Sequence, residues 1–287
     1  MSAPFAIAVA PNGARRTKAD HPRLPMTPAE IAREAAAARE AGAAMLHLHI
    51  RDRAGAHVLD AELYRVALAA ARAEAGPDML LQITTEAVGH YTPAEQIALV
   101  DALRPDSVSL ALREVFADEA GAAALFRRME GWGTLYQIIL YDTADLARIE
   151  ALQARGLLPG GPLPVLPVMG RYSGTGAEAA ELEAYLAAGI TRHAFMLCAF
   201  GAREAEFMAE GARHGGHARV GFENNLWLSD GSLAPDNAAL VAAVAQAVDR
   251  PLADADTLRA IWFTPAETTM KTPESIRRDA IQQGETT

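Results

Sequence analysis

The sequence predicts an α/β fold in which eight strand–helix units close into a (β/α)8, or TIM, barrel. Short apolar runs rich in strand-forming residues alternate along the chain with Ala-rich segments of helix length. Eight such pairs fill about 250 residues, a length and count typical of this barrel. A doubly wound sheet is the rival architecture. No G-x-G-x-x-G motif follows the first run, which weakens the dinucleotide-binding version of that rival.

The apolar runs give the expected strands. In a parallel barrel both faces of a strand are normally buried, so a polar residue inside such a run is informative. The strands are predicted at 5–10, 44–50, 79–85, 106–112, 134–140, 164–169, 193–200 and 218–223.

Capping signals support the expected helices. The motif "TPAE" at 27–30 is a capping box with Pro at the first helical position; it recurs at 92–95, and "TGAE" at 175–178 is a variant. Gly42 and Gly189 follow helical segments and are predicted C-terminal caps. The helices are predicted at 27–42, 61–75, 93–104, 117–130, 143–155, 176–188, 202–214 and 235–249.

No linker or change in composition divides the chain, so the sequence predicts one domain over residues 1–287. The barrel is expected at about 5–249. A C-terminal helical extension is expected at about 250–287, where "FTPAE" and "KTPES" both resemble helix starts.

Composition excludes several classes of partner. The formal net charge is −10 and no long basic run is present, which disfavours nucleic acid and anionic membrane surfaces as partners. No apolar run approaches the ~18 residues of a membrane span, and the N-terminus lacks the basic start of a signal peptide. Cys198 is the single cysteine, so we expect a buried structural thiol and a cytoplasmic protein.

The stretch "MLHLHIRD" at 45–52 breaks the apolar pattern of the strands. Side chains alternate along a strand, so three aliphatic residues share one face while His47, His49 and Arg51 share the other. Residues two apart on a strand have Cα atoms about 6–7 Å apart, which lets two imidazoles converge on one metal ion. Two hydrogen-bonded core histidines are the alternative interpretation of this pair.

Glu223 supplies a third candidate ligand. It lies in "RVGFENN", at the predicted end of the last strand, where a carboxylate points toward the same mouth of the barrel. Two histidines, one glutamate and an open position form a catalytic zinc set. A helix cap or a solvated loop residue is the alternative for Glu223. The six other histidines are predicted to be structural or solvated.

Four segments together resemble the β-keto acid cleavage enzymes. They are "APNGARRTKADHPRLPMTPAEIA", "AGAAMLHLHIRD", "QITTEAVG" and "GGHARVGFENNLW", and the resemblance covers nearly the whole chain. It implies a zinc-dependent (β/α)8 barrel that assembles as a homotetramer. It also implies transfer of an acyl unit between a β-keto acid and acetyl-CoA, which gives acetoacetate and a new CoA ester.

The resemblance also implies residue roles. His47, His49 and Glu223 would hold zinc, with another divalent metal as an alternative. Arg219 would stabilise anionic intermediates, and Thr84 would stand near the substrate. Without the resemblance, a structural ion pair with Glu223 is an equal interpretation of Arg219.

The Gly-rich stretch "GRYSGTG" at 170–176 follows a predicted strand and opens a helix. Its backbone N–H groups, with Gly170 and Ser173 as candidates, could bind a CoA phosphate or a substrate carboxylate. A plain tight turn is the alternative.

The sequence departs from the family pattern at several points. Asn224 replaces the aspartate thought to act as the base, and Asn cannot take a proton at neutral pH, so a substrate-binding role is expected for it. Glu86 and Glu114 are candidate replacements for the base. Arg15 stands where an acidic residue is common, which favours an anionic substrate.

The missing aspartate leaves two other functions open. One is a metal-dependent carbon–carbon lyase or hydrolase that does not use CoA. The other is a non-catalytic, metal-dependent ligand binder. Fold analogy alone does not decide among these functions.

Overall fold

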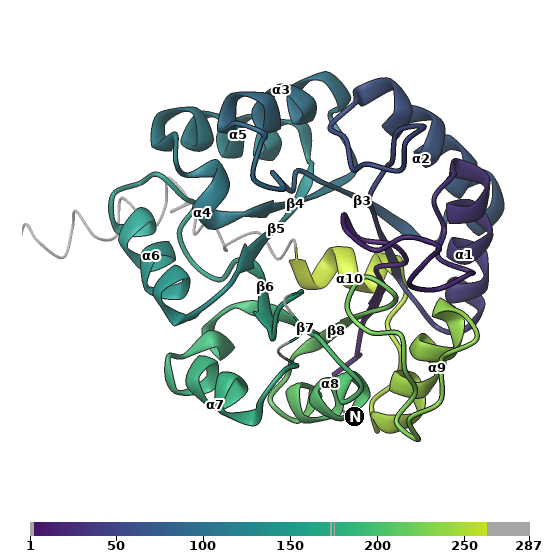
Figure 1. Ribbon diagram of the computed structural model, residues 1–287. Coiled ribbons are helices and arrows are strands. Elements are labelled where there is room, and N and C mark those ends of the chain that lie inside the picture. Colours follow the sequence, from purple (N-terminus) through teal and green to yellow (C-terminus); the bar gives the residue numbers. More distant parts are fainter. Residues whose placement is uncertain (1–2, 173, 175, 263–287) are drawn as a thin grey trace, which may run out of the picture.

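The computed structural model describes residues 3–172, 174 and 176–262. Eight parallel strands close into a barrel in sequence order, because β1 pairs with both β2 and β8 (Figure 1). The predicted TIM barrel is therefore confirmed. The strands are β1 (Ile7–Val9), β2 (Met45–Leu48), β3 (Leu80–Thr84), β4 (Ser107–Ala111), β5 (Leu135–Leu140), β6 (Pro164–Met169), β7 (Ala194–Ala199) and β8 (His217–Val220).

Helices surround the barrel, and the predicted caps at their ends are largely confirmed. Thr27 and Thr92 each form a capping box, and Gly42 and Gly189 follow their helices with φ of +111° and +85°. The helices are α1 (Pro28–Glu40), α2 (Ala61–Ala75), α3 (Pro93–Leu103), α4 (Leu112–Val115), α5 (Glu119–Trp132), α6 (Thr143–Ala154), α7 (Ala179–Ala187), α8 (Glu204–Arg213), α9 (Asn237–Ala247) and α10 (Ala255–Trp262), with a 3₁₀ turn η1 (Ile190–Arg192).

Some local features differ from the predictions. Helix α7 begins later than expected, with Glu178 as its N-cap and Glu181 completing the capping box. The expected cap, Thr175, lies outside the described residues. The short turns α4 and η1 were not predicted, because elements of three or four residues show no periodic pattern.

The strands bury two different faces. The outward side chains of β2, Leu46 and Leu48, join the main core between barrel and helices, as predicted. The inward side chains form a second cluster inside the barrel that includes Ala8, Met45 and Met196. The barrel is therefore a packed core at this level, and the cavity beside His47 and His49 opens nearer its C-terminal end.

Helix α10 closes the N-terminal end of the barrel. Leu258 and Trp262 pack against the inward cluster, and Figure 1 shows α10 across the middle of the ring. The backbone of Phe5 accepts a hydrogen bond from Ala253 (2.9 Å) and donates one to Pro251 (2.8 Å), which ties this segment to the entry of β1. Part of the predicted C-terminal extension is thus helical; the "FTPAE" and "KTPES" segments lie outside the described residues.

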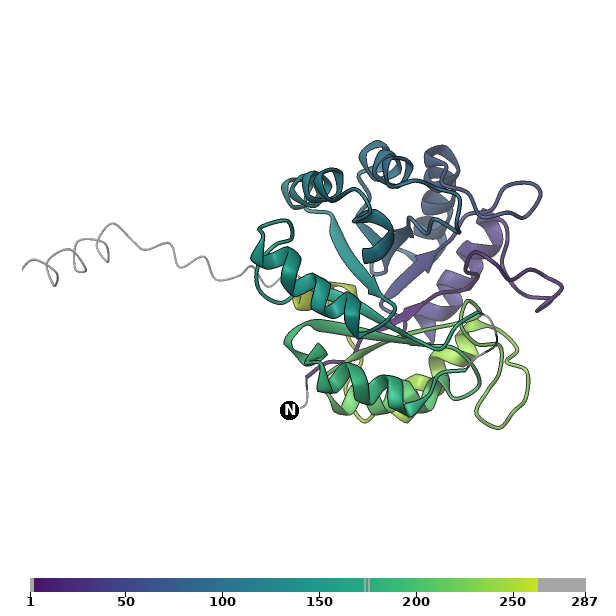
Figure 2. The same cartoon turned by 60° about the vertical axis from the view of Figure 1, so that its left-hand side comes forward.

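The opposite end of the barrel carries the long loops. Figure 2 shows the loop between β1 and α1 projecting from the side away from α10. Parallel strands all end on that side, so the polar residues that follow them gather there. Across the part of the chain that the structure describes, no helix has the length and apolar character needed to cross a membrane.

The packing of α10 predicts a stability effect. Leu258 is 0% exposed and Leu63 on α2 is 39% exposed. Leu258→Ala should lower the free energy of unfolding by about 2–5 kcal/mol, because it removes buried methyl groups and leaves a cavity. Leu63→Ala, the matched control, should have a much smaller effect. Urea unfolding measures both, and equal losses for the two variants would contradict the packing role of α10.

Candidate metal centre and active site

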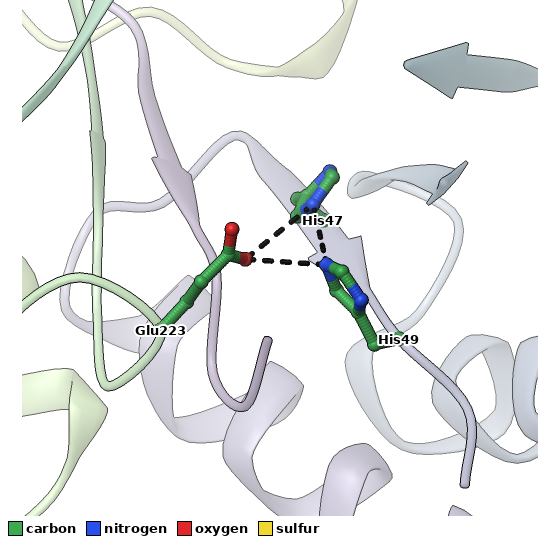
Figure 3. A group of neighbouring side chains, drawn as sticks. All are labelled: His47, His49 and Glu223. Atoms are coloured by element: carbon green, nitrogen blue, oxygen red, sulfur yellow. Dashed lines mark hydrogen bonds and ion pairs between the residues drawn. The ribbon is translucent and has the colours of Figure 1, made fainter. Parts of the chain in front are cut away.

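His47, His49 and Glu223 converge on one point, as the sequence predicted (Figure 3). The two Nε2 atoms are 3.2 Å apart, and Glu223 Oε2 lies 3.5 Å from His47 Nε2 and 3.4 Å from His49 Nε2. Ligand atoms about 2.0–2.1 Å from a tetrahedral zinc ion are roughly 3.3 Å apart. The three atoms therefore form a triangle of the size that a single such cation requires. All three side chains are buried.

A hydrogen bond from the barrel interior orients His47. Its Nδ1 lies 2.8 Å from Oε1 of Gln82, which can only accept, so Nδ1 carries the proton and Nε2 keeps a free electron pair. Gln82 Nε2 in turn donates to Ser107 Oγ (3.3 Å) and Gln137 Oε1 (3.4 Å). Gln82 was not predicted as part of the site, although a polar residue at an inward position of "LLQIT" is a visible signal.

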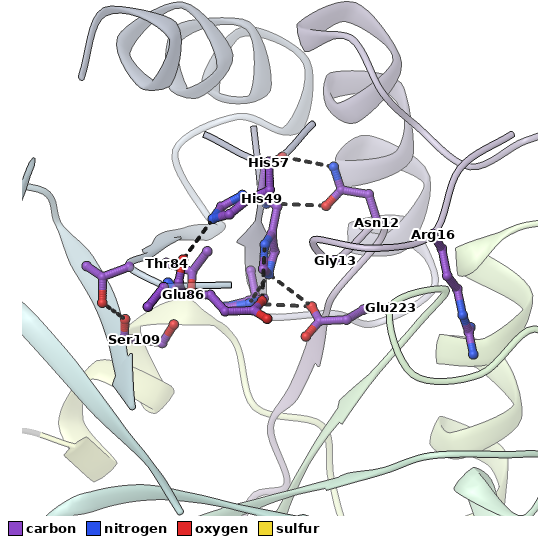
Figure 4. Close-up of polar contacts among 12 residues, drawn as sticks. Asn12, Gly13, Arg16, His49, His57, Thr84, Glu86, Ser109 and Glu223 are labelled. Atoms are coloured by element: carbon purple, nitrogen blue, oxygen red, sulfur yellow. Dashed lines mark hydrogen bonds and ion pairs between the residues drawn. The ribbon is translucent and has the colours of Figure 1, made fainter. Parts of the chain in front are cut away.

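The backbone of His49 is fixed from a different loop. Asn12, which follows β1, donates from Nδ2 to the His49 carbonyl (2.8 Å) and accepts from the His49 N–H at Oδ1 (3.2 Å), as Figure 4 shows. This amide thus acts as an additional strand partner where β2 ends. Asn12 was not predicted as part of the site, because nothing in "APNG" shows which residue its side chain contacts.

Glu223 reaches the site from a turn and not from a strand. The predicted strand at 218–223 ends at Val220, because Gly221 has φ of +135° and the chain then turns. The Glu223 N–H bonds to the Ala10 carbonyl (3.1 Å), which brings the turn against the loop after β1. A Cβ on Gly13 in that loop would stand 2.6 Å from Glu223 Cγ, so glycine permits this close approach.

The donor set fits a divalent metal ion. Glu223 Oε2, the atom that faces both imidazoles, is buried and has no hydrogen-bond partner among the residues that the structure describes. Burial, reinforced by Arg219, lowers the pKa of His47 to about 3, and burial lowers that of His49 to about 4, so both rings are neutral at pH 7. Burial acts to raise the pKa of Glu223, but Arg219 and the imidazoles hold it below its usual range. Two neutral imidazoles and a carboxylate are ligands that zinc prefers.

The position of Arg219 agrees with both interpretations that the sequence left open, a structural ion pair with Glu223 and a positive charge beside the substrate. Its Nη2 donates to Glu223 Oε1 (3.0 Å) and to Cys198 Sγ (3.2 Å), so it forms a buried ion pair. It also borders the ligand cavity, and its Nη1 lies 3.2 Å from His47 Nε2. A bound cation would compete for that nitrogen. Cys198 is buried, as predicted, and burial raises its thiol pKa to about 11.

A cavity of about 620 Å³ opens above the three ligands at the C-terminal mouth of the barrel. This volume is within the usual range for small-molecule sites. The walls combine charged side chains with an apolar patch on one side. They include the predicted residues Arg15, Thr84, Glu86, Glu114 and Arg219 and the apolar residues Ile139, Val168 and Phe200.

The two candidate bases differ in their surroundings. Glu114 Oε2 accepts hydrogen bonds from the Ala87 N–H (3.0 Å) and Gln96 Nε2 (2.9 Å), so it braces the loop after β3. Within the described chain no hydrogen bond to the Glu86 carboxylate is found, and its Oε2 lies 3.7 Å from His49 Nδ1 (Figure 4). Burial, with Glu223 and Glu114 nearby, raises the pKa of Glu86 to about 7. Of the two carboxylates, that of Glu86 is thus the less engaged by its neighbours.

Three other predicted residues are not placed in the cavity wall. Asn224 is fully buried, and its side-chain nitrogen and oxygen have no partner among the described residues. The Gly170 N–H is already donated to the Glu181 carboxylate (2.9 and 3.1 Å), so the turn interpretation fits it better than anion binding. Ser173 lies outside the described residues.

Arg15 differs from the other arginines of the cavity. It is exposed at the mouth, and its guanidinium carbon lies 5.3 Å from the ring centre of Tyr172. No hydrogen bond or ion pair to Arg15 is found within the described part of the chain, so its charge is free for a ligand. The other cavity arginines have partners: Arg113 with Asp145 (2.7 Å), Arg171 with the Gly170 carbonyl (2.6 Å) and Arg219 with Glu223 (3.0 Å).

Comparison with solved structures agrees with the fold. The complex of ObcA with oxaloacetate matches with a TM-score of 0.66 at 16% identity, over 84% of this chain and 67% of that chain. At this identity the likeness shows the barrel fold and no more.

Sequence comparison identifies the family. The 3-keto-5-aminohexanoate cleavage enzyme of Acetoanaerobium sticklandii is 29% identical over 87% of this chain and 94% of its own length. The 3-oxoadipate:acetyl-CoA acetyltransferase of Cupriavidus necator is 29% identical over 93% of this chain and 97% of its own length. The family described as beta-keto acid cleavage enzyme matches residues 4–262. This chain belongs to the β-keto acid cleavage enzyme family.

Proposed function

We propose that this protein is a metal-dependent enzyme that exchanges an acyl unit between a β-keto acid and acetyl-CoA. The acyl group of the keto acid passes to CoA, and the acetyl group joins the remaining two-carbon acid to give acetoacetate. The observation that carries the proposal is the convergence of His47, His49 and Glu223 at the floor of the cavity. Zinc is the proposed metal, although another divalent cation would fit the same donors.

The metal and the surrounding residues would have different roles in the reaction. When bound, the cation would act as a Lewis acid toward a substrate carbonyl oxygen. Arg219 presents a buried positive charge next to the ligands, where it stabilises negative charge that develops on the substrate. Thr84 accepts a hydrogen bond from the Glu86 N–H (3.3 Å), which leaves its own hydroxyl proton free to donate to a substrate oxygen.

Glu86 is our choice for the base. Carbon–carbon exchange next to a carbonyl needs a group that accepts and returns a proton. Asn224 cannot do so, and its side chain does not border the cavity. Glu86 borders the cavity with a carboxylate that accepts no hydrogen bond from the described residues, whereas Glu114 holds the loop after β3.

We also propose that the substrate carries a second negative charge away from its keto group. The related enzymes are named for acids with different distal groups, such as an amino group and a second carboxylate. Arg15, whose charge is free, stands at the mouth where such a distal group would lie. It would attract a carboxylate and repel an ammonium group.

A homotetramer and a cytoplasmic location stay predictions. The first rests on the resemblance to the family and the second on the single cysteine of the sequence. Light scattering after size exclusion and fractionation of cells that contain the protein would test them.

The first experiment tests metal and reaction together. Protein loaded with Zn²⁺ is incubated with acetyl-CoA and a panel of cationic, neutral and anionic β-keto acids, and CoA esters and acetoacetate are measured by mass spectrometry. The wild type should form both products. His47→Ala/His49→Ala should lose bound metal, measured by elemental analysis, and should lose turnover by a factor of at least about 10³. His214→Ala, an exposed position, is the matched control.

The same panel separates the alternatives. Turnover of a keto acid without acetyl-CoA would favour a lyase or hydrolase. Metal-dependent binding with no turnover of any acid would favour a ligand binder. Either outcome would contradict the acyl-transfer proposal.

The choice of base predicts an unequal effect of two substitutions. Glu86→Gln should lower kcat by about 10²–10⁴-fold, because it removes the proton acceptor, while metal content stays unchanged. Glu114→Gln should lower kcat much less, because its amide can still accept from the Ala87 N–H. Steady-state kinetics of the metal-loaded variants measure both. A larger loss of kcat for Glu114→Gln than for Glu86→Gln would indicate that Glu114 is the base and would contradict our choice.

The free charge of Arg15 predicts a change in substrate preference. Arg15→Glu should raise KM for an anionic β-keto diacid by about tenfold or more and lower it for an amino-substituted acid, because the sign of the charge at the mouth is reversed. The ratio of kcat/KM for the two substrates is the measurement. Arg53→Glu, on the loop after β2 and exposed, is the control. An unchanged ratio in Arg15→Glu would show that Arg15 does not contact the distal group.

A further inference from the structure

The hydroxyl group of Tyr172 is a polar atom that the proposed function does not yet use. Tyr172 lies in the loop between β6 and α7 and borders the cavity. Its hydroxyl oxygen is buried and has no hydrogen-bond partner among the described residues. Burying an unpaired hydroxyl costs free energy, so such an atom beside a ligand cavity indicates a partner that arrives with the ligand.

The position of the hydroxyl relates it to the metal centre. A Cβ built on Gly13 would stand 2.7 Å from the Tyr172 hydroxyl oxygen and 2.6 Å from Glu223 Cγ. The hydroxyl and the Glu223 side chain are therefore close neighbours on the same side of the loop. A substrate held next to Glu223 would come within reach of this hydroxyl.

The ring of Tyr172 is held on two sides. Phe200 packs edge-on against it with ring centres 4.7 Å apart, and the Arg15 guanidinium lies over it at 5.3 Å. The ring of Tyr172 makes both contacts, and its hydroxyl takes part in neither. They fix the direction of the O–H group before a ligand binds, which reduces the entropy lost on binding.

The hydroxyl acts as a donor. Burial, with the negative charges of Glu223 and Glu86, raises the pKa of Tyr172 well above its usual value, so the group keeps its proton. The sequence left two interpretations of the stretch at 170–176, anion binding through backbone N–H groups and a plain tight turn. The structure instead places a side-chain donor of that stretch at the cavity wall.

We propose that the Tyr172 hydroxyl donates a hydrogen bond to an oxygen atom of the β-keto acid bound at His47, His49 and Glu223, and so positions the substrate. The inference rests on the proposed function. Tyr172 would act as a substrate-binding residue, with no proton transferred.

The test removes the hydroxyl and keeps the ring. Tyr172→Phe preserves the contacts with Phe200 and Arg15, so the variant should fold with an unchanged melting temperature and bind Zn²⁺ as the wild type does. Acetoacetate is the probe, and its Kd for Zn²⁺-loaded protein is measured by calorimetry without acetyl-CoA. We expect Kd to rise about tenfold, the loss of one hydrogen bond to a charged or polarised oxygen.

Tyr136→Phe is the matched control, because it removes a hydroxyl from the outer face of β5, in the core beside Phe126. It should leave Kd unchanged. An unchanged Kd in Tyr172→Phe, with binding intact in the wild type, would overturn this inference alone. Weaker Zn²⁺ binding or a lower melting temperature in that variant would also overturn it, because both indicate a structural role. Absence of acetoacetate binding by the Zn²⁺-loaded wild type would overturn the proposed function and this inference with it.

Discussion

The site depends on the contact between the loop after β1 and the turn after β8. Glu223 comes from that turn and the histidines from β2, so a rigid neighbour must set their distance. The loop supplies it, because Asn12 binds the His49 backbone while Gly13 packs against the Glu223 side chain. Arg51 fixes the loop in turn, donating to the carbonyl oxygens of Gly13 (3.0 Å) and Arg16 (2.9 Å).

Polar residues inside the barrel also help to position the site, because they orient His47. His47, Gln82 and Gln137 replace apolar interior residues, which costs hydrophobic burial. The cost is limited because Gln82 joins its neighbours through hydrogen bonds at both ends of its amide. This chain of bonds fixes one tautomer and one ring orientation of His47. The interior gives up some apolar packing so that the Nε2 atom faces Glu223 with its electron pair free.

The sequence predicts the parts of this arrangement that follow from periodicity. Strand positions come from apolar runs, and the facing of His47 and His49 comes from the two-residue alternation, so both are confirmed. Glu223 was found although its strand ends earlier, because the carboxyl end of β8 meets the same mouth. Asn12 and Tyr172 could not be found this way, because they act through contacts across the barrel that no local pattern encodes. The Gly170 N–H was a candidate for binding an anion, but in the structure it donates to the Glu181 carboxylate.

The asparagine at position 224 can be understood from the charges that surround it in the fold. A carboxylate at 224 would follow Glu223 directly in a buried turn, where the two negative charges would repel each other. Asn removes that repulsion and leaves Arg219 to Glu223. Under the proposed function, the negative charge that a base requires comes instead from Glu86 in the loop after β3, whose pKa burial raises to about 7. In that proposal the proton acceptor comes from the loop after β3, and the turn after β8 supplies only the candidate metal ligand Glu223.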